Sequence, residues 1–147
     1  MSTQTDHDSS NSDNHGVSSV NFAFNDRNVI VSTGSLDGKV KLWDLRKASK
    51  SKTKPPMIME VPFKNASTGL PDAVVFGAVS PSGDRFVGTC FGSTSFYCDL
   101  GAPTADKFVL KGLKGAKTSS FYVKTAFSLG GDFFVSGGSN SVVSVWD

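Results

Sequence analysis

The chain has 147 residues, of which 38% are hydrophobic, and this is long enough for one ordinary domain with a real core. Its formal net charge of +2 is too small to indicate a nucleic-acid groove or a membrane surface. No run of about 18 apolar residues could span a bilayer, and the polar start lacks the charged-then-apolar pattern of a secretory signal. We therefore expect a cytosolic or nuclear protein.

The first residues and the first expected strand differ sharply in composition. Residues 1–14 are poor in hydrophobic side chains and rich in Ser, Asn and Asp. Such a segment cannot bury enough surface to offset the entropy of ordering it, so we expect a disordered lead-in. After it, Val20, Phe22 and Phe24 alternate with polar or small residues, which predicts a strand. A turn over residues 25–28 is expected to end this strand.

The segment from Val29 to Lys47 reads as two strands, at 29–35 and 39–45, joined by a tight turn. Leu36-Asp37-Gly38 has the composition of a hairpin turn, in which the glycine is free to adopt a positive φ. The second strand alternates polar and apolar side chains and ends in Trp43-Asp44. These signals predict a hairpin with one buried face.

The segment that follows is basic. Residues 47–56 are rich in Lys and end in two prolines, so they cannot pair as a central strand. We interpret them as a solvent-exposed loop. The alternative is that the lysines from Lys47 to Lys54 make a weak electrostatic contact with DNA or with an acidic partner. Residues 57–61 are then expected to form the outer strand of a four-stranded antiparallel unit.

Two further units repeat this scheme of strands joined by turns. In the second unit the third strand ends in Cys98-Asp99, so Cys98 takes the position that Trp43 has in the first. The third unit ends in Trp146-Asp147. The strands that we expect are 73–79, 85–90, 93–100 and 107–110 in the second unit, followed by a linker at 111–117, and 121–127, 133–137 and 142–146 in the third.

The spacing between the Asp-Gly turn and the Trp-Asp pair resembles the inner hairpin of a WD-repeat propeller blade. The resemblance implies an all-β fold, a partial WD-repeat β-propeller with about three four-stranded antiparallel blades. The blades are expected at 15–61, 62–111 and 112–147, the second divergent and the last without its outer strand. Propellers close with about four to eight blades, so three cannot close a ring. We expect a fragment of a longer protein rather than a ring completed by another chain.

In WD repeats a His, a Ser or Thr, the turn Asp and the Trp form a buried chain of hydrogen bonds. Family spacing places these residues at His15, Thr33, Asp37 and Trp43. The Asp orients the His, the His holds the hydroxyl, and the hydroxyl accepts from the indole N–H. The quartet superficially resembles a catalytic triad, but a nucleophile needs exposure and an oxyanion site. We therefore interpret it as a structural network.

No other group of residues indicates catalysis or a bound cofactor. The sequence has no paired carboxylates, no phosphate-binding glycine loop, and no His and Cys at metal-ligand spacing. Cys90 and Cys98 are expected to be small buried hydrophobic residues rather than a disulfide, a metal site or a catalytic thiol. We expect no enzyme activity, cofactor, small-molecule ligand or membrane contact.

The first hairpin ends in a Trp-Asp-x-Arg sequence, formed by Trp43, Asp44 and Arg46. It is similar to the docking motif by which WD-repeat receptors bind the propeller adaptor of cullin-4 ubiquitin ligases. Arg46, just past the strand, would project from one face of the ring, where its planar fork can pair bidentately with an acceptor. The alternative is that Arg46 is only a charged residue at a solvated strand end.

A second stretch, from Ser119 to Lys124 and on to residues 134–137, is not a generic WD-repeat sequence. Together with residues 39–47 it resembles the later blades of the denticleless family of cullin-4 RING E3 ubiquitin ligase substrate receptors, over about residues 17–147. The resemblance implies a non-catalytic receptor that presents PCNA-bound proteins for replication-coupled degradation in the nucleus, with the cytoplasm as a second location. The alternative is a WD-repeat interaction scaffold unconnected with ubiquitin.

Overall fold

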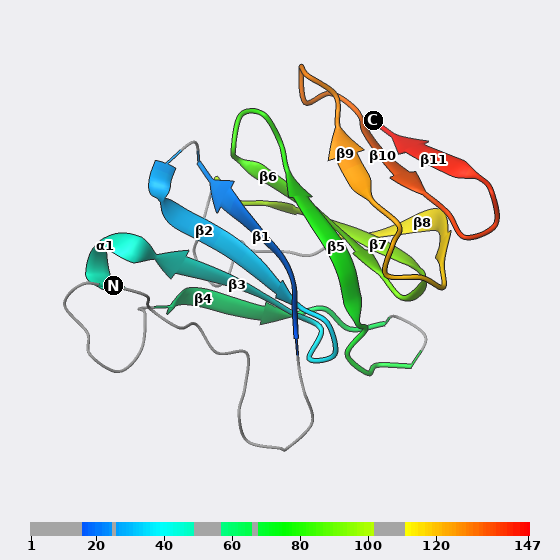
Figure 1. Ribbon diagram of the computed structural model, residues 1–147, viewed down its shortest axis with the longest axis horizontal. Coiled ribbons are helices and arrows are strands. Elements are labelled where there is room, and N and C mark those ends of the chain that lie inside the picture. The colour runs from blue at the N-terminus through cyan, green and yellow to red at the C-terminus, as the bar shows by residue number, and fades with distance from the viewer. Residues whose placement is uncertain (1–15, 25, 49–56, 66–67, 102–110) are drawn as a thin grey trace.

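The described part of the chain forms three antiparallel sheets, side by side and each twisted (Figure 1). The computed structural model describes residues 16–24, 26–48, 57–65, 68–101 and 111–147. The first sheet contains β1 (Val17–Ala23), β2 (Asp26–Gly34), β3 (Lys39–Asp44) and β4 (Met57–Pro62). The second contains β5 (Val74–Val79), β6 (Arg85–Cys90), β7 (Gly92–Asp99) and β8 (Lys111–Thr118). The third contains β9 (Thr125–Phe127), β10 (Phe134–Gly137) and β11 (Val143–Trp146).

Within each sheet, strands that follow one another in the chain are neighbours, so every sheet is a meander. A single helical turn, α1 (Leu45–Ala48), follows β3. No helix in the described ranges has the length and apolar character needed to cross a membrane. The expected lead-in at 1–14, the Lys-rich residues 49–56 and the strand expected at 107–110 lie outside the described residues.

The hairpin of β2 and β3 forms as the sequence predicts. Gly38 has a φ of +62°, and a Cβ at this position would lie 2.8 Å from the carbonyl oxygen of Asp72. The Asp37 carboxylate caps the turn by accepting a hydrogen bond from the Lys39 N–H at 3.0 Å. The resulting register places Ile30 opposite Trp43.

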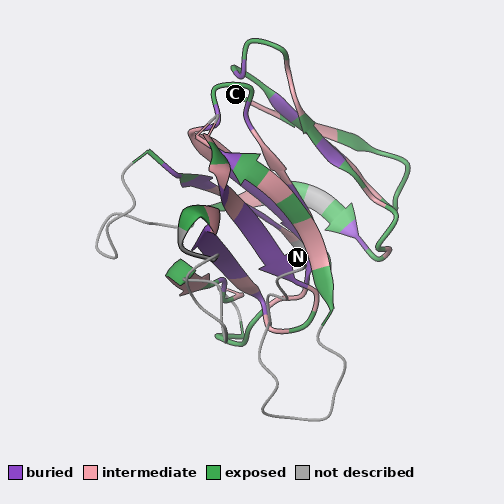
Figure 2. Ribbon diagram, turned by 60° about the vertical axis from the view of Figure 1, so that its left-hand side comes forward, coloured by how far each residue is buried: buried purple, intermediate pink, exposed green. Residues whose placement is uncertain are grey.

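The core lies between the first and second sheets. Val31, Val40 and Leu42 from the first sheet meet Phe86 and Phe96 from the second, and all five are at most 1% exposed. Phe63, which follows β4, stacks on Phe96 with ring centroids 4.6 Å apart. Figure 2 shows the buried residues gathered along the strands in the middle of the molecule. This apolar layer holds the two sheets together.

The interface between the second and third sheets contains hydroxyl groups as well as apolar groups. Thr89 of β6 and Thr125 of β9 share a hydrogen bond of 2.6 Å, and Ser136 of β10 lies 3.5 Å from both hydroxyls. Arg85 also donates to the carbonyl oxygen of Gly131 at 3.1 Å. All three hydroxyl-bearing residues are buried, so these bonds satisfy groups that water does not reach.

Two strand predictions are wrong in this region. Residues 111–118 form β8, which pairs with β7, and not the linker expected at 111–117. The lysines and glycines of this segment mask the usual strand pattern, and they are tolerated because β8 is an edge strand with one unpaired side. In the third unit, β9 begins only at Thr125, whereas the expected strand begins at residue 121. Phe121 and Tyr122 instead lie in a loop, 47% and 91% exposed.

The first strand forms, but its large apolar residues do not face the core. Val20 and Phe22 are 58% and 61% exposed, whereas Phe24, which follows the strand with a φ of +57°, packs against the core. The opposite face packs on the second sheet: Ala23 is fully buried, and Asn21 donates to the carbonyl oxygen of Gly77 at 3.0 Å.

Candidate functional site

Arg46 is positioned by the end of β3. The strand stops at Asp44, and α1 begins at the next residue. The Asp44 carboxylate accepts a hydrogen bond from the backbone N–H of Arg46 at 3.0 Å. An acidic side chain that accepts from the second residue of a helical turn is an N-cap, so Asp44 both ends the strand and starts the turn.

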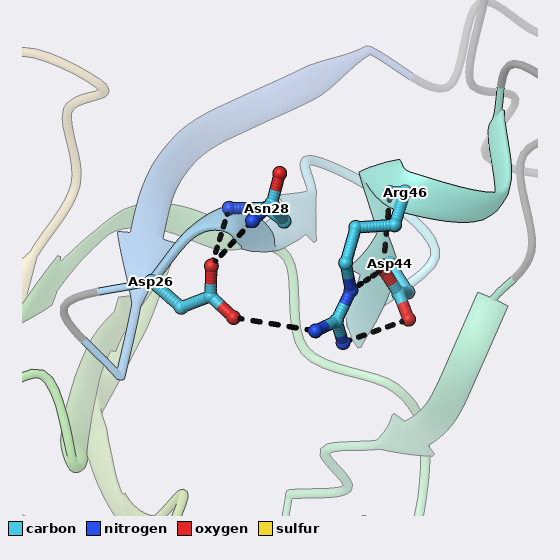
Figure 3. A network of polar contacts seen from close by, with 4 residues as sticks. All are labelled: Asp26, Asn28, Asp44 and Arg46. Atoms are coloured by element: carbon cyan, nitrogen blue, oxygen red, sulfur yellow. Dashed lines mark hydrogen bonds and ion pairs between the residues drawn. The ribbon is translucent and has the colours of Figure 1, made fainter.

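The guanidinium of Arg46 folds back onto the same carboxylate (Figure 3). Its Nε donates to Asp44 Oδ1 at 2.9 Å and its Nη2 donates to Asp44 Oδ2 at 3.1 Å, which is a bidentate pair. Nη1 lies 3.9 Å from Asp26 Oδ2, at the start of β2. The pKa of Arg46 is raised above its usual value, first by the hydrogen bond to Asp44 and then by the charge of that carboxylate.

Asp26 is itself held in place. Its Oδ1 accepts from the backbone N–H and from the side-chain amide of Asn28, both at 2.8 Å. These bonds lower the pKa of Asp26, with the backbone bond the largest cause. The Arg46 side chain nevertheless remains 59% exposed. The arrangement therefore presents a fixed, charged, planar donor at one end of the first sheet.

Trp43 lies immediately before Asp44 and is 4% exposed. Its indole N–H donates to the hydroxyl of Ser32 at 2.8 Å. The prediction of Thr33 as the acceptor is wrong. Side chains alternate along a strand, and Ile30, which lies opposite Trp43, shares its face with Ser32 and not with Thr33.

Thr33 instead belongs to a cluster of hydroxyls on the other face of the sheet. Its Oγ1 lies 2.8 Å from the hydroxyl of Ser18 and 2.7 Å from that of Ser19, both on β1. Thr33 is fully buried, and these bonds satisfy it. It therefore links the first two strands rather than supporting the indole.

The turn carboxylate of Asp37 lies close to a buried lysine. Lys41 is 3% exposed, and its Nζ lies 3.7 Å from Asp37 Oδ2 and 3.4 Å from Glu60 Oε2. His15, the expected partner of Asp37, lies outside the described residues, so its place in the network stays a prediction.

Comparison with known proteins identifies the repeats. The family model for the WD domain, G-beta repeat, matches residues 3–44 and 109–147, which together are more than half of the chain. The chain belongs to the WD40-repeat family. Its sheets are therefore propeller blades. Solved structures agree with this fold: a chain from a crystal structure of a mitotic checkpoint complex matches 90% of this chain with a TM-score of 0.65 at 14% identity. The Swd1 β-propeller domain of Myceliophteria thermophila matches 88% with a TM-score of 0.62 at 10% identity.

These matches cover 37% and 39% of the two solved chains, so the WD40 repeats described above form an unclosed part of a propeller. Curated relatives have denticleless names. The chain is 29% identical over 129 residues to the protein lethal(2)denticleless of Drosophila melanogaster, and 28% and 27% identical to the denticleless homologues of Xenopus laevis (A) and Homo sapiens. The matches span 84–86% of this chain but only 16–17% of these proteins.

The three WD40 blades can be compared through the strand pair that carries the tryptophan. Trp146 lies opposite Phe134, as Trp43 lies opposite Ile30, and its ring stacks on Phe134 with centroids 4.8 Å apart. In the second blade Cys98 lies opposite Phe86. Cys98 therefore takes the tryptophan position, as the sequence predicts.

Both cysteines of the second WD40 blade are free thiols and fully buried. Burial is the largest cause that raises the pKa of each thiol far above its usual value. A thiol must ionise to react, so the fold protects both. Among the described residues, no group of three or more His, Cys, Asp and Glu side chains could hold a metal ion.

We expect native protein at about pH 8 to react with a thiol reagent such as Ellman's reagent only as fast as the chain unfolds. In denaturant both thiols should react within minutes. The unfolded thiols ionise near the ordinary cysteine pKa of 9.0, whereas the folded ones keep their protons. Stability is therefore retained below about pH 9 and falls as the pH rises further. Equally rapid labelling of native and denatured protein would contradict the burial.

Sequence reasoning missed two residues of the site. Asp26 was expected only as part of a turn, and its approach to Arg46 across the end of the first blade has no local signal. Ser32 could have been found by counting alternate residues along β2 from the partner of Trp43.

Proposed function

We propose that this chain is part of a non-catalytic substrate receptor of a cullin-4 RING E3 ubiquitin ligase, and that Arg46 docks the propeller adaptor of the ligase. The observation that carries the proposal is that the Arg46 side chain is 59% exposed while Asp44, which follows the blade Trp, fixes its guanidinium. The similarity to denticleless proteins supports it.

The bidentate pair with Asp44 reduces the entropic cost of docking Arg46 on a partner. An exposed arginine normally loses rotamer freedom when it binds a partner. Here Asp44 holds Nε and Nη2 along one edge of the guanidinium, and more than half of the side chain is left in solvent. A partner that offers a carbonyl or carboxylate oxygen would meet a donor already in position.

The receptor would act by position alone. One surface holds the adaptor and another holds the substrate, which raises the effective concentration of substrate lysines near the charged conjugating enzyme. By the same resemblance we propose PCNA-bound proteins as substrates, replication-coupled degradation as the process, and the nucleus as the location, with the cytoplasm as a second. A weak DNA contact through Lys47–Lys54 also stays a proposal.

A scaffold function without ubiquitin is the second candidate, and one observation favours it. The Arg46 guanidinium already has a bidentate carboxylate partner and a second carboxylate at 3.9 Å. In this alternative the arginine only neutralises two acidic side chains at the end of the first blade.

The two candidates differ in what Arg46→Glu does. Tagged full-length protein would be captured from cell extract and probed for the cullin-4 adaptor, and affinity for purified adaptor would be measured alongside. We expect the variant to bind the adaptor at least about 30-fold more weakly, a loss of roughly 2 kcal/mol, because a paired contact at an interface centre is lost.

Two further variants serve as controls. Arg27→Glu makes the same charge change at a neighbouring exposed residue, and should leave capture unchanged. Arg46→Lys keeps the charge but lacks the planar fork, and should weaken binding by an intermediate amount. Equal capture by wild type and Arg46→Glu would remove the docking role, and absence of capture by both would favour the scaffold.

A further inference from the structure

A pocket of about 260 Å³ lies between the second and third blades, at their hairpin end. The β8–β9 loop and the β10–β11 turn meet there, at the end of the molecule away from α1 (Figure 1). Two hydrogen bonds join the end of β8 and the start of this loop to the β10–β11 turn: Ser119 N–H donates to Ser139 Oγ at 2.8 Å, and Ser139 N–H donates to the carbonyl oxygen of Lys117 at 2.8 Å. The residues that line the pocket include Phe91, Lys117, Thr118, Ser119, Ser139 and Asn140.

Thr118 is the unusual residue of this pocket. It is 1% exposed, and its hydroxyl has no hydrogen-bond partner among the described residues. A buried hydroxyl without a partner is costly, so native proteins rarely keep one without a reason. In the described part of the chain the hydroxyl of Ser95 is the other such group, and Ser95 does not line this pocket.

Phe91 lines the pocket and belongs to an exposed aromatic pair. Phe91 is 44% exposed, and its ring lies against that of Phe121, 47% exposed, with centroids 5.6 Å apart. Tyr122, the next residue, is 91% exposed. Clustered exposed aromatic side chains indicate a contact surface, because single exposed apolar residues are common but clusters are not.

The charged and polar groups that line the pocket indicate the chemistry of the ligand it would bind. Lys117 is exposed at the rim, and the described residues that line the pocket include no acidic side chain. An ammonium group and an unused hydroxyl donor together favour a carboxylate, which can accept from both. The aromatic pair favours an apolar side chain next to that carboxylate.

We propose that this pocket binds an acidic peptide segment, with a Glu or Asp carboxylate on Thr118 Oγ1 and Lys117 and a neighbouring aromatic side chain on the Phe91–Phe121 pair. The site lies at the opposite end of the blades from Arg46, so a peptide and an adaptor can be bound together. Peptide binding does not depend on the docking role of Arg46, and its test contains no adaptor.

The probe is a fluorescein-labelled peptide, Gly-Phe-Glu-Glu-Phe-Gly, titrated with the full chain and followed by fluorescence anisotropy. We expect saturable binding that Thr118→Val and Lys117→Met each weaken at least fivefold. The same peptide with Gln in place of Glu should bind at least fivefold more weakly to the wild type. Thr118→Val removes an unsatisfied group at constant shape, so its midpoint of thermal unfolding should stay the same or rise.

Ser95→Ala is the matched control, because it removes the other buried hydroxyl without a partner in the described ranges but lies outside the pocket. It should leave peptide affinity unchanged. Absence of saturable binding, unchanged affinity in Thr118→Val and Lys117→Met, or equal affinity for the Gln peptide would each overturn the proposal. If Thr118→Val does not fold, Lys117→Met and the Gln peptide still decide it.

Discussion

Phe96→Ala is expected to lower the free energy of unfolding by about 3–5 kcal/mol. Phe96 is fully buried, stacks on Phe63 at 4.6 Å, and lies 6.0 Å from the ring of Phe86. Its truncation would leave a cavity between the first and second blades. The ring also fills the space above Gly88, where a Cβ would lie 2.2 Å from its Cζ. Gly88 has no side chain that could fill the space left by the ring.

Urea denaturation followed by tryptophan fluorescence measures this loss. Phe121→Ala provides the control, because the same atoms are removed from a ring that is 47% exposed, and it should cost less than about 1 kcal/mol. Losses of similar size in the two variants would contradict the assignment of the core to the interface between the first and second blades.

The first hairpin was predictable because its signals are local. An Asp-Gly turn, a β-branched run and a period-2 pattern all point to the same register between β2 and β3. β8 has none of these signals. Lys111, Lys114 and Lys117 recur every third residue, with Gly112, Leu113, Gly115 and Ala116 between them, and only pairing with β7 makes the segment a strand. Pairing with a neighbouring strand therefore determines that this segment is a strand, and its local sequence pattern does not.

The candidate site divides in the same way. Trp43, Asp44 and Arg46 are close in sequence, so their proximity in space was predictable. The approach of Asp26 to Arg46 depends on how the start of β2 meets the end of β3, which sequence spacing does not reveal. The Thr118 pocket is harder to predict from the sequence, because it forms only where residues 91–92, 117–119 and 139–140 meet.

The WD40 blades are joined by two chemically different interfaces. The first and second blades share an apolar layer with aromatic stacking beside the hydroxyls around Thr33, whereas the second and third share a set of hydroxyls around Thr89. Hydroxyl bonds contribute less net stability than apolar burial of similar area, because water competes for them in the unfolded chain. The pocket that we propose for peptides lies at the less apolar of the two interfaces.

Trp43→Ala is expected to lower the free energy of unfolding by about 3–5 kcal/mol, because it removes a large side chain that is 4% exposed. A double-mutant cycle separates the indole hydrogen bond from this loss of packing. Trp43→Phe combined with Ser32→Ala should show a coupling energy of roughly 0.5–1.5 kcal/mol, since Ser32 accepts from the indole N–H at 2.8 Å.

Thr33→Val provides the comparison, because Thr33 lies on the opposite face and bonds to Ser18 and Ser19. On its own it should destabilise the blade by about 1–3 kcal/mol, since it leaves two serine hydroxyls without this partner. Its coupling with Trp43→Phe should be within about 0.5 kcal/mol of zero. A larger coupling energy for Thr33 than for Ser32 would mean that Thr33 accepts the hydrogen bond from the indole N–H. The side chains of β2 would then alternate in the opposite sense.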